Sequence, residues 1–328
     1  MQFEFIRRCG ASLFGAALLA ALLLGGTAMA QGYPDRPVKI VSVTSAGTGV
    51  DDFTRLMAND MAKRLGRNFF VENKPGANTI IACDAVAKAP PDGYTLLLAS
   101  GSSIAANPYL FKNLPFDVNK DLVPVARLAA LPVTVVVPGN SPYRTLADLF
   151  AGARAKPGKL NYGTSSAGYR TMLRAINGVG KIDAVDVPYK AMSQLLPDLM
   201  VGTLDYSILE VAAAVPHVQS GKLRALAISS PARVPALPDV PTLAEAGAGE
   251  ATLVSWIALM APGGTPAPVV DKLARAANEF LATPEAAAHF VARGTLAFPA
   301  TGRDFTRFIA EDQAKWKHYI AAAGIQPE

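Results

Sequence analysis

The stretch VKIVSVTSAGTGVDDFTRLMANDMAKRL, residues 38–65, decides the fold class. Residues 38–43 are rich in valine and isoleucine, as in a strand, and residues 53–65 place apolar side chains at helical spacing. The turn between them contains Gly47 and Gly49, which permit a close approach to the backbone. A strand that leads into a helix through such a turn predicts an anion site at the helix start, for a nucleotide phosphate or a carboxylate.

The rest of the chain repeats this alternation of strands and helices. Further strand-like runs are NFFVEN, YTLLLAS, VTVVV, KLNYGT, AVDVPY and LRALAIS, and further helix-like runs are TLADLFAGARA, SQLLPDLMVG and PVVDKLARAANEFLA. The last segment, residues 302–324, reads as an amphipathic helix that buries Phe305, Phe308, Ile309, Trp316 and Ile320. Repeated strand-helix units predict an α/β fold with parallel sheets, in which ligands bind where strands end at converging loops.

The first thirty residues resemble a signal peptide. Arg7 and Arg8 precede a short apolar core, and Ala28-Met29-Ala30 forms a small-x-small cleavage pattern directly behind it. The alternative is a membrane anchor, for which the apolar run is short. We therefore expect residues 1–30 to be a signal peptide cleaved after Ala30, and a soluble periplasmic protein that begins at Gln31.

The composition restricts the function further. The chain has 328 residues and a formal charge of +5, and its basic residues are scattered, which argues against nucleic-acid binding. After processing, Cys83 is the single cysteine, so no intramolecular disulfide can form. Export and the absence of the third glycine of a dinucleotide fingerprint, where Asp52 stands, argue against a dinucleotide cofactor. We expect no cofactor and no metal, and a carboxylate becomes the favoured ligand.

Seven ordered motifs identify a family resemblance. They are VENKPGAN (71–78), DAVAKAPPDGYTLLLAS (84–100), NPYLFKNLPFDVNKDLVPVA (107–126), VPYK (187–190), PHVQSGKLRALAIS (216–229), PALPDVPTLAEAG (235–247) and APGGTPAPVVDKL (261–273). Together they resemble the extracytoplasmic solute-binding receptors of tripartite tricarboxylate transporters, the Bug family, over essentially the whole mature chain.

The resemblance implies a two-lobed periplasmic binding protein of the Venus-flytrap, type II-like kind, each lobe a mostly parallel sheet flanked by helices. Lobe 1 would comprise residues 31–130 and 255–328, and lobe 2 residues 131–254, with crossings near 128–133 and 254–258. It further implies that a small organic carboxylate is held between the lobes, mainly by backbone N–H groups. The implied partners are the large and small integral-membrane transporter components, and we expect a monomer.

The resemblance also implies the ligand-binding residues. In lobe 1 they are Thr44, Ser45, Ala46, Gly47, Thr48 and Gly49 in the first turn, and Ser100, Ser102 and Ser103 in the second. In lobe 2 they are Ser165, Ser166, Ala167, Gly168, Tyr169, Arg170 and Leu209.

This chain departs from the family pattern at several of these positions. Residues 45–48 replace a turn that usually carries two adjacent glycines, and Tyr169 and Arg170 replace a histidine-bearing turn. Leu209 stands where an aspartate is common, with Glu210 next to it, so the usual acceptor for a ligand amine or hydroxyl is removed. A guanidinium beside an aromatic ring can bind a second carboxylate. We therefore expect an aromatic or medium-length dicarboxylate rather than an amino acid.

Other interpretations remain open. Asp51 and Asp52 fit the first turn of a helix, where acidic residues complement the dipole, Ser165 and Ser166 fit a helix cap, and Arg170 could face solvent. A secreted hydrolase is disfavoured, because GTSSA (163–167) lacks the final glycine of a nucleophile elbow. A ligand-binding subunit of a membrane sensor kinase would use the same lobes, and the sequence does not separate that role from transport.

Overall fold

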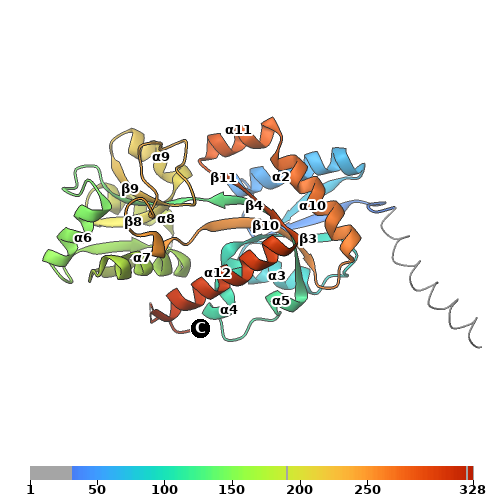
Figure 1. Ribbon diagram of the computed structural model, residues 1–328, viewed down its shortest axis with the longest axis horizontal. Coiled ribbons are helices and arrows are strands. Elements are labelled where there is room, and N and C mark those ends of the chain that lie inside the picture. Colours follow the sequence, from blue (N-terminus) through green and yellow to red (C-terminus); the bar gives the residue numbers. More distant parts are fainter. Residues whose placement is uncertain (1–31, 190, 323, 328) are drawn as a thin grey trace, which may run out of the picture.

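The computed structural model describes residues 32–189, 191–322 and 324–327, which form two α/β lobes lying side by side and joined by central strands (Figure 1). The expected signal peptide, residues 1–30, lies outside the described residues. Within the described part of the chain, no helix has the length and apolar character needed to span a bilayer.

Lobe 1 is built on a six-stranded sheet in the order β11-β4-β10-β3-β1-β2. Strands β1, β2 and β3 are parallel, and β4, β10 and β11 pair in antiparallel fashion. The strands are β1 (Val38–Ser42), β2 (Phe69–Asn73), β3 (Thr95–Ser100), β4 (Leu122–Leu131), β10 (Ser255–Pro262) and β11 (Leu296–Thr301).

Lobe 2 is built on a five-stranded sheet in the order β7-β6-β8-β5-β9. Strands β6, β7 and β8 are parallel, whereas β5 runs antiparallel to both of its neighbours. The strands are β5 (Val133–Pro138), β6 (Asn161–Thr164), β7 (Val185–Pro188), β8 (Tyr206–Glu210) and β9 (Leu223–Ser229).

Both sheets are therefore mixed, and not mostly parallel as expected. The reason is the way the chain passes between the lobes. It leaves the first sheet at the end of β4 and enters the second at Val133, then returns to the first sheet at Ser255 along β10. Because β4 carries the chain out and β10 carries it back beside it, the two strands must run in opposite directions.

Helices cover both faces of the lobe 1 sheet, because its strands direct apolar side chains alternately to one face and the other. In β3, Leu96 and Leu98 face one apolar cluster, and Leu97 and Ala99 face the other. The first cluster packs under α2 (Gly49–Leu65), α10 (Ala267–Leu281) and α11 (Pro284–Arg293). The second packs under α3 (Ile80–Ala87), η2 (Ser102–Ala106), α4 (Asn107–Leu110), α5 (Val118–Asp121) and α12 (Gly302–Ala322), with η1 (Ala77–Thr79) preceding α3.

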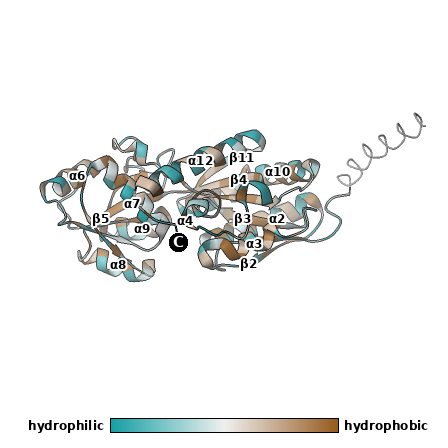
Figure 2. Ribbon diagram, turned by 90° about the horizontal axis from the view of Figure 1, so that it is seen from below, coloured by the Kyte–Doolittle hydropathy of each residue, from teal (hydrophilic) through white to brown (hydrophobic). Residues whose placement is uncertain are grey.

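Lobe 2 repeats the three-layer arrangement, and Figure 2 shows apolar ribbon concentrated toward the interior of both lobes. One face of its sheet packs under α6 (Leu146–Ala155) and α7 (Ala167–Gly180), and the other under α8 (Met192–Met200) and α9 (Val211–Gln219). The short turn η3 (Gly249–Ala251) precedes β10. Helix α12 contacts both lobes, because it packs on η2 and β4 in lobe 1 and on α7 in lobe 2.

Candidate functional site

The first predicted turn joins β1 to α2 and is held by its own side chains. Thr48 caps the helix, with Oγ1 accepting a hydrogen bond from the Asp51 amide at 3.2 Å, and its hydroxyl donates to the Ser45 carbonyl at 3.0 Å. Gly47 has a φ of +77°, a backbone conformation that would be strained for a residue with a side chain. Residues 45–48 are exposed.

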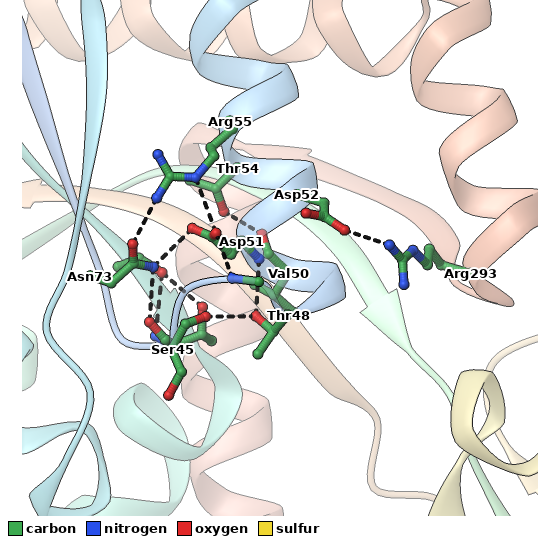
Figure 3. Close-up of polar contacts among 12 residues, drawn as sticks. Ser45, Thr48, Val50, Asp51, Asp52, Thr54, Arg55, Asn73 and Arg293 are labelled. Carbon is green, nitrogen blue, oxygen red and sulfur yellow. Dashed lines mark hydrogen bonds and ion pairs between the residues drawn. The ribbon is translucent and has the colours of Figure 1, made fainter.

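Asp51 fixes this turn from behind. Its side chain is almost fully buried, and Oδ2 accepts from the Gly47 amide at 2.9 Å and from Arg55 Nε at 3.0 Å. Asn73 Nδ2 donates to Oδ1 at 2.9 Å and to the Thr44 carbonyl at 3.0 Å (Figure 3). Burial alone would raise the pKa of Asp51, but its hydrogen bonds to Asn73, Gly47 and Arg55 hold it below the ordinary value. The turn's Gly47 amide is therefore already occupied by a carboxylate of the chain itself.

The second lobe 1 turn, between β3 and η2, is closed by paired hydroxyls. Ser103 is fully buried, and its Oγ accepts from the Ser100 amide at 2.9 Å and donates to the Ser100 carbonyl at 2.8 Å. Ser102, in contrast, is exposed. Beneath the turn lies the buried indole of Trp256, whose Nε1 donates to Asp312 Oδ2 of α12 at 2.8 Å. Ser103 thus shapes the turn, and Ser102 is the hydroxyl available at its surface.

The lobe 2 turn between β6 and α7 faces this second turn. Ser166 caps α7, accepting from the Tyr169 amide at 3.2 Å. A Cβ placed on Gly168 would lie 4.0 Å from Ser102 Oγ and 3.9 Å from Trp316 Cη2, so the two lobes approach each other here. Ser165 is half-buried beside the cap, and Ala167 is the first residue of α7.

Tyr169 and Arg170 both have partners within lobe 2. The Tyr169 hydroxyl donates to Glu210 Oε1 at 3.0 Å, and burial together with the Glu210 charge raises the pKa of Tyr169 well above its ordinary value. Arg170 Nε forms an ion pair with Asp186 Oδ2 of β7 at 2.8 Å. Asp186 also accepts from Thr164 Oγ1 at 2.8 Å. Arg170, whose guanidinium was expected to bind a second carboxylate of the ligand, thus already pairs with the Asp186 carboxylate.

A cavity of about 240 Å³ lies between the lobes beside the first turn. From lobe 1 it is lined by Thr44, Thr48 and Gly49 of the predicted set, and from lobe 2 by Glu210 and Ala212. Its apolar walls are Val50, Phe53, Ala129, Leu131, Ile257 and Phe290, and its remaining lining residues are His289, Arg293 and Thr295. The β1–α2 turn of lobe 1 and the β8–α9 junction of lobe 2 therefore line one cavity, whereas the predicted residues of the β3–η2 and β6–α7 turns do not line it.

Leu209 does not line this cavity. Side chains alternate along β8, which directs Leu209 into the fully buried cluster under α8. Glu210, at the end of the strand, is exposed and lines the cavity in its place. Leu209, expected to contact the ligand, is therefore buried away from the cavity, and an acidic side chain, that of Glu210, lines it.

The C-terminal end of α11 is a wall of the cavity that sequence reasoning missed. Gly294, which follows α11, packs against lobe 2, because a Cβ there would lie 2.9 Å from Val211 Cγ1 and 3.7 Å from the Ala212 nitrogen. Burial and the nearby Arg293 charge lower the pKa of His289 below its ordinary value, so this imidazole is neutral at pH 7. No local motif marks α11, because its role depends on contacts with residues far away in the sequence, such as that of Arg293 with Asp52.

A larger hollow, of about 580 Å³, lies between α7 and the end of α12. It is lined by residues such as Arg174, Asn177 and Tyr319, and by none of the predicted ligand-binding residues. We therefore take the smaller cavity, which the predicted residues Thr44, Thr48 and Gly49 line, as the candidate site. Among the described residues there is no cluster of His, Cys, Asp or Glu suited to hold a metal ion.

The sequence of residues 53–325 matches the model of the tripartite tricarboxylate transporter family receptor. The chain belongs to this receptor family. It is 36% identical over 331 residues to a UPF0065 protein of Bordetella bronchiseptica, covering 98% of each chain. It is also 33% identical over 300 residues to BugT of Bordetella pertussis, covering 90% of this chain and 92% of BugT.

Solved structures of family members share the fold. R. palustris Rpa4515 with adipate superposes with a TM-score of 0.77 at 30% identity, covering 90% of this chain and all of that one. MatC from Rhodopseudomonas palustris with bound malate superposes with a TM-score of 0.70 at 30% identity, covering 88% and 100%. The two-lobed α/β fold expected of this family member is thus confirmed, and the family consists of solute-binding receptors.

Proposed function

We propose that this protein is a periplasmic receptor that captures a small organic carboxylate between its lobes and delivers it to a tripartite tricarboxylate-type membrane transporter. The observation that carries the proposal is the cavity at the start of α2, which residues of both lobes line. Helix starts favour anions, because their first N–H groups lack partners within the helix. Relatives solved with adipate and with malate, both carboxylates, support the ligand class.

The finer expectation of an aromatic or medium-length dicarboxylate depended on Arg170. Because Arg170 pairs with Asp186, a second ligand carboxylate would have to share or displace that partner. Replacing Arg170 with alanine while testing adipate against hexanoate measures this directly. We expect a selective loss of adipate binding if the ligand engages Arg170, and an equal small change for both acids if Arg170 serves only Asp186.

A thermal-shift screen tests the carboxylate proposal itself. Protein stripped of bound ligand by unfolding and refolding is heated with a broad set of mono- and dicarboxylates. A ligand that binds the native state alone stabilises it by roughly 2.7 kcal/mol at a hundredfold excess over its dissociation constant. No shift with any carboxylate would contradict the proposal, and turnover of a compound would favour the hydrolase alternative.

The cellular role needs separate measurements. Intact-mass analysis of the exported protein should give a chain that begins at Gln31, and retention of residues 1–30 would reject periplasmic release. Co-purification with detergent-solubilised transporter components, strengthened by ligand, would support delivery to a transporter. Ligand-dependent activation of a membrane kinase without such binding would instead support the sensor role.

A further inference from the structure

Arg293 lies directly against the start of α2. It is the last residue of α11, and its Cδ, Nε and Nη1 atoms lie 3.6, 3.8 and 3.8 Å from the position that a Cβ on Gly49 would take. Its Nη2 forms an ion pair with Asp52, in the first turn of α2 (Figure 3). The Arg293 side chain is 46% exposed, so the guanidinium is reachable from the cavity that it lines.

The backbone beside Arg293 offers further donors. The amide of Asp51 is capped by Thr48, and that of Asp52 bonds to the Thr48 carbonyl. The amides of Gly49 and Val50 precede these in the first turn, where a helix supplies no acceptor. Both residues line the cavity. An anion at the cavity's α2 end therefore meets two backbone donors and one guanidinium.

The charges around the cavity favour an anion at the end formed by the start of α2. Glu210, on the lobe 2 wall, repels a carboxylate from the opposite side. His289 is neutral at pH 7 and adds no charge. Among the described residues that line the cavity, Arg293 is the one permanent cation, and Asp52 neutralises it only along one edge of a guanidinium that carries five N–H donors.

We propose that Arg293 binds the ligand's carboxylate together with the Gly49 and Val50 amides, so that α11 forms a third wall of the site. The inference rests on the proposed carboxylate function and adds the cation that selects an anionic group. Arg293 has a competing structural role, which is to hold α2 through Asp52. The two roles predict opposite effects of removing Asp52, because the ligand and Asp52 compete for the same guanidinium.

The test measures dissociation constants by calorimetry for succinate, malate, adipate and butyrate on stripped protein. Variants are Arg293→Ala, Arg293→Lys and Asp52→Asn, with Arg307→Ala as the matched control. Arg307 pairs with Asp304 at 2.8 Å on exposed α12, away from the cavity. We expect Arg293→Ala to weaken the binding carboxylates about tenfold, because a half-exposed charged hydrogen bond is partly screened. Arg293→Lys should lose less, Asp52→Asn should bind more tightly, and Arg307→Ala should bind as wild type does.

Two other outcomes would contradict the role of Arg293, and a third would contradict the proposed function. If wild-type protein binds carboxylates and Arg293→Ala changes their affinities less than twofold, the role of Arg293 is overturned while the receptor function stands. If Arg293→Ala and Asp52→Asn weaken binding alike, Arg293 acts only as a structural contact, and the proposal also fails. If wild-type protein binds none of these acids or any other carboxylate in the thermal-shift screen, the proposed function itself fails. Circular dichroism and melting temperatures of each variant exclude misfolding as the cause of a loss.

Discussion

The two helix starts that face the space between the lobes, α2 in lobe 1 and α7 in lobe 2, are built differently. At α2, the buried Asp51 binds the turn from behind and is itself held by Asn73 and Arg55. At α7, Ser166 supplies a cap, and the nearby Arg170 turns toward Asp186 instead of bracing the turn. The lobe 1 turn is thus bound directly by a buried carboxylate, whereas the lobe 2 turn is capped by one hydroxyl, and the polar contacts beside it are made by Tyr169 and Arg170 of the helix.

From this difference we expect the lobe 1 turn to be more rigid than the lobe 2 turn. A turn that is already organised loses little conformational entropy when it binds a ligand, so lobe 1 is suited to hold the ligand first. The following predictions test whether the two turns really differ in rigidity, beginning with the largest expected effect.

Asp51→Ala should lower the free energy of unfolding by about 2–4 kcal/mol, because it removes the buried carboxylate that accepts from the Gly47 amide, Asn73 and Arg55. Urea denaturation measures the change. Asp52→Ala, which removes the neighbouring exposed carboxylate, is the matched control and should change stability by less than about 1 kcal/mol. Equal losses for the two variants would mean that Asp51 does not organise the turn.

The free energy of unfolding should depend on pH because of Asp312, which lies beneath the second lobe 1 turn. Burial raises the pKa of Asp312 to about 6, although the hydrogen bond from Trp256 partly offsets it. A carboxyl group whose pKa is higher in the folded than in the unfolded state stabilises the folded protein while it is protonated. This stabilisation is complete below about pH 4 and is lost as the pH rises from about 4 to 6. Asp312→Asn should therefore exceed wild type in stability by about 2–3 kcal/mol at pH 7 and match it near pH 4.

Denaturant unfolding of both proteins at the two pH values measures this difference. Asparagine keeps an oxygen that can accept from Trp256, so the variant isolates the charge. A stability difference between Asp312→Asn and wild type that stays constant from pH 4 to 7 would show that Asp312 titrates normally.

Gly101→Ala should destabilise the protein by about 2 kcal/mol, because a Cβ there would lie 2.8 Å from Nε1 of the fully buried Trp256. Gly168→Ala is the comparison in lobe 2, where the nearest atom would lie 3.8 Å away. Since alanine favours a helix, Gly168→Ala should leave stability unchanged or raise it by up to about 1 kcal/mol. Thermal unfolding of the two variants tests whether the lobe 1 turn is the more tightly packed.

Ser166→Ala should have the smallest effect, a loss of about 1 kcal/mol, which is typical of removing a helix cap. If its loss of stability in urea equals or exceeds that of Asp51→Ala, the proposed contrast between the two turns is wrong. Ser166→Thr, which keeps the capping oxygen, should retain most of the stability and thereby separates the cap from other effects of the substitution.

Local sequence patterns predicted most of the secondary structure. The seven expected strands correspond to β1, β2, β3, β5, β6, β7 and β9, and the segment expected as a terminal amphipathic helix is α12. Four of the five expected stripe residues of α12 are buried, and Phe308 is partly buried. Strands β4, β8, β10 and β11 were not among the expected strands. β10 and β4 combine proline or small residues with apolar ones, and their pairing joins segments more than 120 residues apart.

The candidate site was predicted in part. Thr44, Thr48 and Gly49 line the cavity because they belong to a strand-turn-helix unit, whose geometry is local. Leu209 does not line the cavity, whereas Glu210, the next residue, does, because successive side chains of a strand point to opposite faces. Arg170 was expected from its residue type to meet the ligand, but an acidic partner on β7 was not foreseen.

By itself, the sequence determined the α/β class, the receptor family and the turn at the start of α2, because these depend on short-range periodicity, glycine positions and ordered motifs. The tertiary structure alone decided which charges meet at that turn. Asp51 and Asp52 are adjacent in sequence, yet one is buried against Asn73 and the other pairs with Arg293 across 241 positions. Packing of distant elements sets burial and ion pairing, and these determine which polar groups remain available to a ligand.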